Sequence, residues 1–218
     1  MKKLFKMFIL ATGLVLCFNA KSFADVDLSI WGGYGFAGTV SLAHDDLDLT
    51  GKQLGIKGHY SFTFFETFEL GLGLFFQYSK INADTVVTRD PSFGGVYEDT
   101  FIRNSTRMNY GLDVTFFWVL PTMPISPYVR AIYSFKDHVT INKEMFGGNI
   151  SGSDSNKIDG SGFGIGAGIE YELSQSIRLF GEFMYEFSKF SFPVVAGFDE
   201  NFKINIFSVN IGLTFLIF

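Results

Sequence analysis

Lys203 to Phe218, at the C-terminal end of the chain, reads KINIFSVNIGLTFLIF and alternates between apolar and polar side chains. Successive side chains of a β-strand point to opposite faces, so this period of two predicts a strand. One face of that strand is entirely apolar and carries Phe207, Val209, Ile211, Leu213, Phe215 and Ile217. Nothing within the segment covers these side chains, and the pattern therefore predicts that a lipid bilayer does.

The N-terminal 24 residues have the three parts of a secretory signal. Three lysines among the first six residues precede an apolar run over residues 7–18, and the small residues Ser22 and Ala24 follow it. The apolar run is too short to cross a bilayer as a helix, which needs about 20 residues. We therefore expect cleavage after Ala24, with residues 1–24 removed as a signal peptide and residues 25–218 retained as one domain.

The single cysteine, Cys17, lies within the predicted signal, so residues 25–218 contain none. This excludes a disulfide framework, a catalytic thiol and any metal site built on cysteine. Removal of the signal changes the formal charge from −5 to −9, because it takes away four lysines and no acids. A chain of this charge repels nucleic acid, so we expect no nucleic-acid partner.

Eight stretches alternate with a period of two and predict strands. They cover residues 26–37, 52–64, 68–79, 103–120, 127–136, 161–173, 177–188 and 203–218. Their connections also alternate in length: residues 65–67, 121–126 and 174–176 are short links, whereas the other four links run 14 to 24 residues. Short turns on one rim with long loops on the other are typical of a membrane barrel, and an even strand number leaves no unpaired edge in lipid. The predicted fold class is all-β, an eight-stranded antiparallel up-and-down transmembrane β-barrel.

A soluble eight-stranded barrel, such as a lipocalin-like carrier, is the alternative, with its apolar face turned inward. The size of the side chains argues against it. An eight-stranded barrel is only just wide enough to be filled by side chains. The chain contains 28 phenylalanines, and nearly every predicted strand has five or six bulky apolar residues on one face. These side chains cannot all fit inside the barrel.

The opposite face of the strands is rich in Gly, Ser and Thr and carries charges that nearly balance. Buried charges must be paired or solvated, so we interpret these as a salt-bridge network that fills the lumen and leaves little open water path. The bases are Lys57, Arg107, Arg130, Lys136 and Arg178, and the acids are Glu69, Asp113, Glu170, Glu172, Glu182 and Glu186.

The four long links are predicted to be loops, and they hold 13 acids and five bases, a net charge of −8. They are Gly38 to Gly51, Lys80 to Ile102, Asp137 to Gly160 and Lys189 to Phe202. Nearly all of the charge of the mature chain is therefore expected outside the barrel wall.

The chain as a whole resembles the small outer-membrane β-barrels of the OmpA transmembrane-domain, OmpX and Ail-like group. The last strand also resembles the assembly signal of that group: a polar residue, Gly two positions on, then hydrophobic residues three and five positions after the Gly. Its matching residues are Asn210, Gly212, Phe215 and Ile217, with Phe218 one residue beyond. The resemblance implies a bacterial outer-membrane location, reading of this signal by the barrel-assembly machinery, contact with outer-membrane lipid including lipopolysaccharide, and an extracellular ligand bound by the loops.

Some members of that group are enzymes, and His59-Tyr60-Ser61 superficially resembles the His-x-Ser of outer-membrane lipid A deacylases. However, both side chains share the lumen face with Lys57, and no Asn follows the Ser. A packed interior polar pair is the favoured interpretation. We assign no catalytic, cofactor-binding or metal-binding residue from the sequence.

Three functions remain open at this point. The first is a non-enzymatic barrel whose loops serve adhesion, serum-factor binding or envelope integrity. The second is a narrow porin-like channel for ions or small solutes, which an uncompensated lumen charge would favour. The third is a barrel-embedded hydrolase or acyltransferase, which a Ser/His/acid cluster on one rim would favour.

Overall fold

A computed structural model describes residues 25–42, 45–64, 67–83, 86–88, 98–102, 105–147, 150–191 and 201–217. The predicted signal peptide lies outside the described residues, and so does Phe218. The strands are β1 (Asp25–Leu42), β2 (Asp45–Phe64), β3 (Phe68–Ala83), β4 (Val86–Thr88), β5 (Glu98–Ile102), β6 (Ser105–Trp118), β7 (Ile125–Gly147), β8 (Ile150–Ser174), β9 (Ile177–Ser191) and β10 (Asn201–Ile217). Among the described residues, none forms a helix long and apolar enough to cross a membrane.

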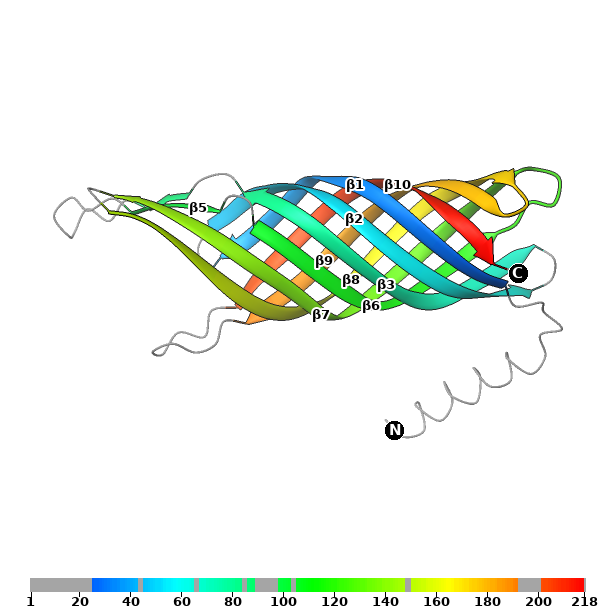
Figure 1. Cartoon of the computed structure of the whole chain (residues 1–218), viewed down its shortest axis with the longest axis horizontal. Helices are drawn as coiled ribbons and strands as arrows, with labels where there is room; N and C mark the ends of the chain where they lie inside the picture. The colour runs from blue at the N-terminus through cyan, green and yellow to red at the C-terminus, as the bar shows by residue number, and fades with distance from the viewer. Residues whose placement is uncertain are drawn as a thin grey trace, which may run out of the picture.

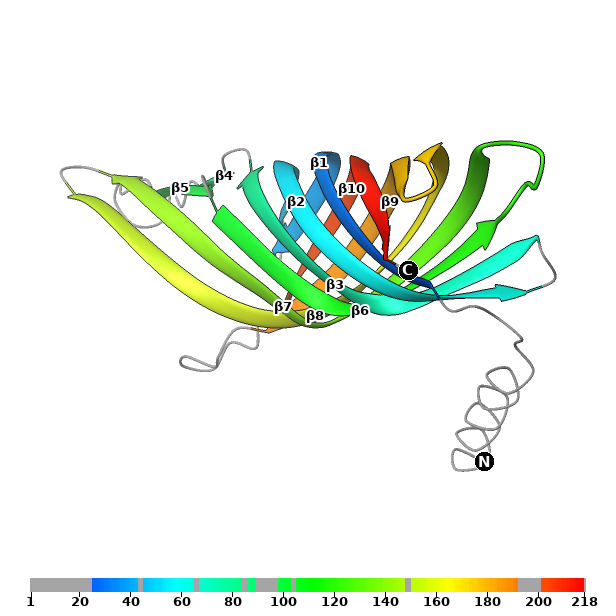
Figure 2. The same cartoon turned by 45° about the vertical axis from the view of Figure 1, so that its right-hand side comes forward.

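Eight of these strands close into a ring of antiparallel neighbours, in the order β1-β2-β3-β6-β7-β8-β9-β10. The last strand pairs with the first, from Val26 opposite Ile217 to Ser41 opposite Lys203, and this pairing closes the ring. The beginning of β1, the end of β10 and the β6–β7 and β8–β9 turns lie at one end of the barrel (Figures 1 and 2). The opposite end, where β1 ends and β10 begins, is here called the loop side. The predicted eight-stranded up-and-down barrel is confirmed.

Most of the bulky apolar side chains on the described strands face outward, as the packing argument requires. Along β6, inward and outward residues alternate without interruption from Ser105 to Trp118. Leu54, Leu74 and Ile211 are each at least 60 % exposed on the outer face of their strands. A band of exposed apolar residues around the ring is the surface that lipid covers in a membrane barrel.

Two of the predicted loops are largely strand, which corrects their assignment as irregular links. β1 and β2 pair as far as Leu42 opposite Asp45, and β7 and β8 pair as far as Gly147 opposite Ile150. The ladders continue because an antiparallel hairpin satisfies its own backbone hydrogen bonds outside the barrel. The alternation of apolar and polar residues stops at the rim, since neither face of the hairpin borders lipid there, and so the pattern gave no strand signal.

The link from Lys80 to Ile102 also contains strand. Ile81 pairs with Ser105, and Val86 pairs with Thr100 in the same register, so β4 and β5 prolong the β3–β6 hairpin. β5 then pairs with β7, from Ile102 opposite Lys143. One side of the barrel, formed by β4, β5, β7 and β8, therefore rises beyond the rim as a hydrogen-bonded sheet (Figure 1). We call this sheet the loop-side wall.

Candidate functional site

The interior of the barrel gathers most of the predicted charge network. Eight of the eleven predicted residues are buried there: Lys57, Glu69, Arg107, Asp113, Arg130, Glu170, Glu182 and Glu186. Arg178 is half-buried at the short-turn end, where its Nη1 lies 3.3 Å from Glu170 Oε2 and 4.0 Å from Glu69 Oε1. Lys136 and Glu172 are exposed, and both assignments to the lumen were wrong.

Arg130 stands at the centre of the network and bridges two carboxylates from different strands. Its Nη2 lies 2.5 Å from Asp113 Oδ2, and its Nη1 lies 2.6 Å from Glu182 Oε1. The guanidinium also stacks over the ring of Trp31, 5.0 Å from the ring centroid. His59 Nε2 lies 2.9 Å from the second oxygen of Asp113, Oδ1. Strands β1, β2, β6 and β9 are thereby tied to β7 through this one side chain and its partners.

Arg107 forms a second centre nearer the loop side. Its Nη2 donates to Asp137 Oδ2 at 2.7 Å and to Ser188 Oγ at 2.9 Å, and its Nε donates to Asp137 Oδ1 at 2.9 Å. Its Nη1 lies 2.9 Å from Glu186 Oε2, and Gln77 donates to the other oxygen of that carboxylate at 3.0 Å. A forked guanidinium that meets carboxylates on both sides is the geometry in which buried ion pairs are best compensated.

A β-bulge explains both Lys136 and the missed residue Asp137. Opposite β6, Tyr110 pairs with Lys136 but Gly111 pairs with Ser134, so Phe135 is an extra residue in β7. One inserted residue reverses the faces of everything beyond it. Lys136 therefore points outward, to solvent or lipid. Asp137, which was predicted to be a loop residue, is fully buried.

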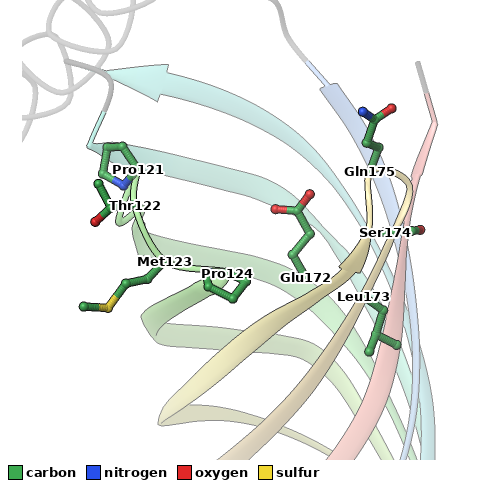
Figure 3. A pocket seen from close by; sticks show the side chains of 8 residues that line it. All are labelled: Pro121, Thr122, Met123, Pro124, Glu172, Leu173, Ser174 and Gln175. Carbon is green, nitrogen blue, oxygen red and sulfur yellow. The ribbon is translucent and has the colours of Figure 1, made fainter.

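Glu172 is exposed because it lies past the end of the interior. From Tyr171 to Ser176 every residue is exposed, since no facing wall remains to cover the inward side of β8. Its side chain projects beside the turn that joins β6 to β7, in a shallow open pocket at the short-turn end (Figure 3). The lining residues are Pro121, Thr122, Met123, Pro124, Glu172, Leu173, Ser174 and Gln175.

The interior also holds large apolar side chains that the sequence argument missed. They form one buried cluster of Trp31, Phe75, Phe117, Tyr128, Ile132, Phe180 and Met184. Lys57 is buried against it, with its Nζ 5.1 Å from the Phe180 ring centroid and 5.6 Å from that of Tyr128. An ammonium group over aromatic faces is stabilised by cation–π attraction.

Glycines make room for this cluster. Trp31 opposes Gly55, Phe75 opposes Gly111, Tyr128 opposes Gly168, Ile132 opposes Gly164, Met184 opposes Gly166 and Phe180 opposes Gly212. A Cβ on Gly55 would lie 2.1 Å from a ring carbon of Trp31, so the indole rests directly on the backbone of the neighbouring strand. The run of inward glycines in β8 was the available signal: it marks where the adjacent strands place bulky residues inside.

Comparison with known proteins agrees with this architecture. Residues 9–215 match the family model of the outer membrane protein beta-barrel domain. The chain belongs to this family. It is therefore a protein of the bacterial outer membrane, as the resemblance predicted, and its wall of apolar side chains faces lipid. A comparison with curated proteins found no match in sequence.

The chain is similar to solved outer-membrane proteins at low sequence identity. Neisserial surface protein A is 10 % identical with a TM-score of 0.50, over 87 % of this chain and 96 % of its own. A major outer membrane protein from Thermus thermophilus is 12 % identical with a TM-score of 0.49, over 89 % and 100 %. The outer membrane protease OmpT from Escherichia coli is 8 % identical with a TM-score of 0.48, over 91 % and 98 %.

In this outer-membrane barrel the His59 and Ser61 side chains meet an acid rather than each other. Ser61 Oγ donates to Asp27 Oδ2 at 3.0 Å, and His59 Nδ1 lies 3.4 Å from the other oxygen of Asp27. A serine nucleophile requires its hydroxyl on the base, and here the hydroxyl proton goes to the carboxylate. All three side chains are buried inside the barrel. Among the described residues, no group of three or more His, Cys, Asp or Glu side chains is placed to hold a metal ion.

Proposed function

We propose that this outer-membrane barrel neither conducts nor catalyses, and that its loop-side wall is a surface for binding an extracellular partner. The observation that carries the proposal is the filling of the interior. The Arg130 and Arg107 centres and the buried apolar cluster around Trp31 all lie inside the barrel, and the Arg130 guanidinium packs on the indole of that cluster. Packed, mutually paired side chains leave no continuous file of water through which an ion could move.

An apolar level near the loop side supports the same conclusion. Seven buried apolar side chains come from the loop-side ends of six strands: Leu49, Ile81, Val139, Ile158, Phe190, Ile204 and Ile206. Apolar constrictions oppose ion passage because they strip the hydration shell and offer no replacement ligand. A pore along the axis would have to cross this level as well as the charged ones.

The loop-side wall supports an interaction role. Its four strands pair with one another through backbone hydrogen bonds. Among the described residues, β8 has no partner on its β9 side beyond Gly160. The β8 edge from Ile150 to Asp159 therefore has backbone donors and acceptors that no described strand pairs on one side, as in sheets that accept a partner strand. The acidic balance of the segments at this side favours a basic partner or divalent cations.

Planar-bilayer recording tests the closed lumen. Refolded wild-type protein should give no steady single-channel current, because each level of the interior is filled. A second variant, Trp31→Ala with Phe180→Ala, removes two large side chains from the buried cluster without removing a charge. It should show current steps more often than the wild type. Steady, large currents from the wild type would favour the porin-like channel instead.

Removal of the outer hairpin tests the interaction surface. Joining Thr140 to Lys157 through an Asn-Gly turn removes residues 141–156 while keeping the pair below them, Thr140 opposite Lys157. The truncated protein should insert normally and unfold at the same urea concentration, since the barrel pairing is intact. Non-adherent bacteria that express the wild type should bind cultured cells, and those that express the truncated protein should not. Equal cell binding by both would refute the role of the wall.

A further inference from the structure

His59 lies in a row of four inward residues, one from each of four neighbouring strands. Asp27 of β1 is directly opposite His59 of β2, His59 is opposite Gly73 of β3, and Gly73 is opposite Asp113 of β6. Gly73 has no side chain, and a Cβ there would lie 2.5 Å from Cδ2 of the His59 ring. The imidazole therefore lies across β3 and reaches a carboxylate on each side. We call the side chains of Asp27, His59 and Asp113 the His59 bridge.

Both ring nitrogens of His59 face carboxylate oxygens. Nε2 lies 2.9 Å from Asp113 Oδ1, and Nδ1 lies 3.4 Å from Asp27 Oδ1. Asp113 is ionised in this arrangement, because Arg130 lies 2.5 Å from its other oxygen and Thr115 donates to Oδ1. An imidazole with a single N–H donates to one of the two acids and turns a lone pair toward the other. Only the imidazolium ion, with hydrogen on both nitrogens, suits both partners.

The groups that surround the ring come from several strands. β3 faces it with Gly71 and Gly73, and Glu69, the next inward residue of that strand, lies 4.0 Å from Arg178. Among the described residues, the charged side chains on or beside the ring are Asp27 of β1, Lys57 of β2, Asp113 of β6, and Arg130 of β7 with its second partner, Glu182 of β9.

This set of charges balances only when His59 is positive. It contains three carboxylates against the ammonium of Lys57 and the guanidinium of Arg130, so a neutral ring leaves one negative charge in excess. The side chains of the His59 bridge are at most 5 % exposed, so water does little to compensate that charge, and an uncompensated buried charge is costly. Lys57 opposes a charge on the ring, but its ammonium lies over the rings of Tyr128 and Phe180.

We propose that the His59 bridge is a pH-sensitive tie, in which an imidazolium ion joins β1, β2 and β6 and is lost in alkaline surroundings. A free histidine loses this proton near about pH 6.5, whereas the two acids keep it on the ring of the folded barrel above that pH. Unfolding then releases the proton, so the contribution of the tie to stability is complete below about pH 6.5 and falls as the pH rises. The loop-side wall takes no part in the tie, so its failure would leave the proposed function untouched.

Urea unfolding in phosphatidylcholine vesicles, from about pH 6 to about pH 9, tests the tie. His59→Gln keeps a hydrogen-bonding side chain of similar length that cannot take up the proton. Above about pH 6.5, the folding equilibrium constant of the wild type should fall about tenfold per pH unit relative to that of the variant, until the folded ring itself loses the proton. Parallel pH courses for the two proteins would overturn the proposal.

His138→Gln is the matched control, because His138 forms its ion pair with Asp159 at a partly exposed site. This variant makes the same substitution outside the His59 bridge and should keep the pH course of the wild type. A course as flat as that of His59→Gln would overturn the assignment of the proton to His59.

Nitrogen NMR gives a readout that does not depend on how well His59→Gln folds. His44→Gln combined with His138→Gln leaves His59 as the one histidine of the chain. In this protein, labelled with ¹⁵N-histidine and refolded in detergent micelles, both ring nitrogens should give the signal of a protonated nitrogen at about pH 8. One unprotonated ring nitrogen at that pH would overturn the proposal.

Discussion

Arg107→Ala combined with Arg130→Ala should destabilise the barrel more than any other pair of side-chain truncations in the lumen. Each arginine is buried and holds two carboxylates, Asp137 with Glu186 and Asp113 with Glu182. Loss of the guanidinium leaves those charges buried without their main cation, at a cost of about 3–5 kcal/mol for each broken centre. Urea unfolding of protein refolded in detergent micelles, and the amount of folded protein in outer membranes, measure the effect.

Arg178→Ala is the control for this prediction. Arg178 is partly exposed at the short-turn end and binds Glu170 and Glu69 at longer distances, so its loss should cost about 1 kcal/mol or less. In the Arg130→Ala background, Glu182→Gln should restore part of the stability. It removes one of the two stranded charges and can still accept from Tyr128 or Asn210. Equal effects of Arg130→Ala and Arg178→Ala would show that the network is solvated.

Changes in the closing strand should block insertion. Gly212 has no room for a side chain, because a Cβ would lie 2.2 Å from the backbone oxygen of Ile30 and 2.7 Å from the Phe180 ring. Phe215 pairs with Leu28 on β1, the contact that closes the ring. Gly212→Asp with Phe215→Asp, or deletion of residues 215–218, should therefore leave little or no protein in the outer membrane, as measured by immunoblot of fractionated cells.

The same strand allows the assembly signal to be tested apart from lipid contact. We propose that the barrel-assembly machinery reads Asn210, Gly212, Phe215, Ile217 and Phe218. Leu213 is on the same face as Phe215 but outside this signal and deeper in the strand, where a charge costs up to about 2–4 kcal/mol near the midplane. In cells, Phe215→Asp should reduce insertion more than Leu213→Asp. In vesicles without the machinery, the order should reverse, and the same order in both settings would exclude a reading role.

The alternation of side chains along each strand was enough to predict the strand number, the outward face and the membrane location. These properties are local, because the side chain at each position in a strand points to the face set by its parity, and bulky residues outnumber what a narrow interior can hold. The paired residues Arg107, Asp113, Arg130, Glu182 and Glu186 follow from the same parity and lie inside as predicted.

The alternation stops predicting which face a side chain occupies where an extra residue is inserted in one of two paired strands. It also does not predict which residues of distant strands meet, and only the tertiary structure decided those points. The bulge at Phe135 exchanges Lys136 for Asp137 as the inward residue, and it exists only in the register between β6 and β7. Trp31 lies on the inward face of β1 by the alternation, but the space for its indole depends on Gly55 of the neighbouring strand. The loop-side wall likewise depends on backbone pairing beyond the rim, where no bilayer imposes a pattern on the side chains. The sequence by itself determined which face of each strand meets lipid, because the bilayer acts on residues one at a time. Closure of the ring determined which residues meet inside, because those contacts join strands far apart in the chain.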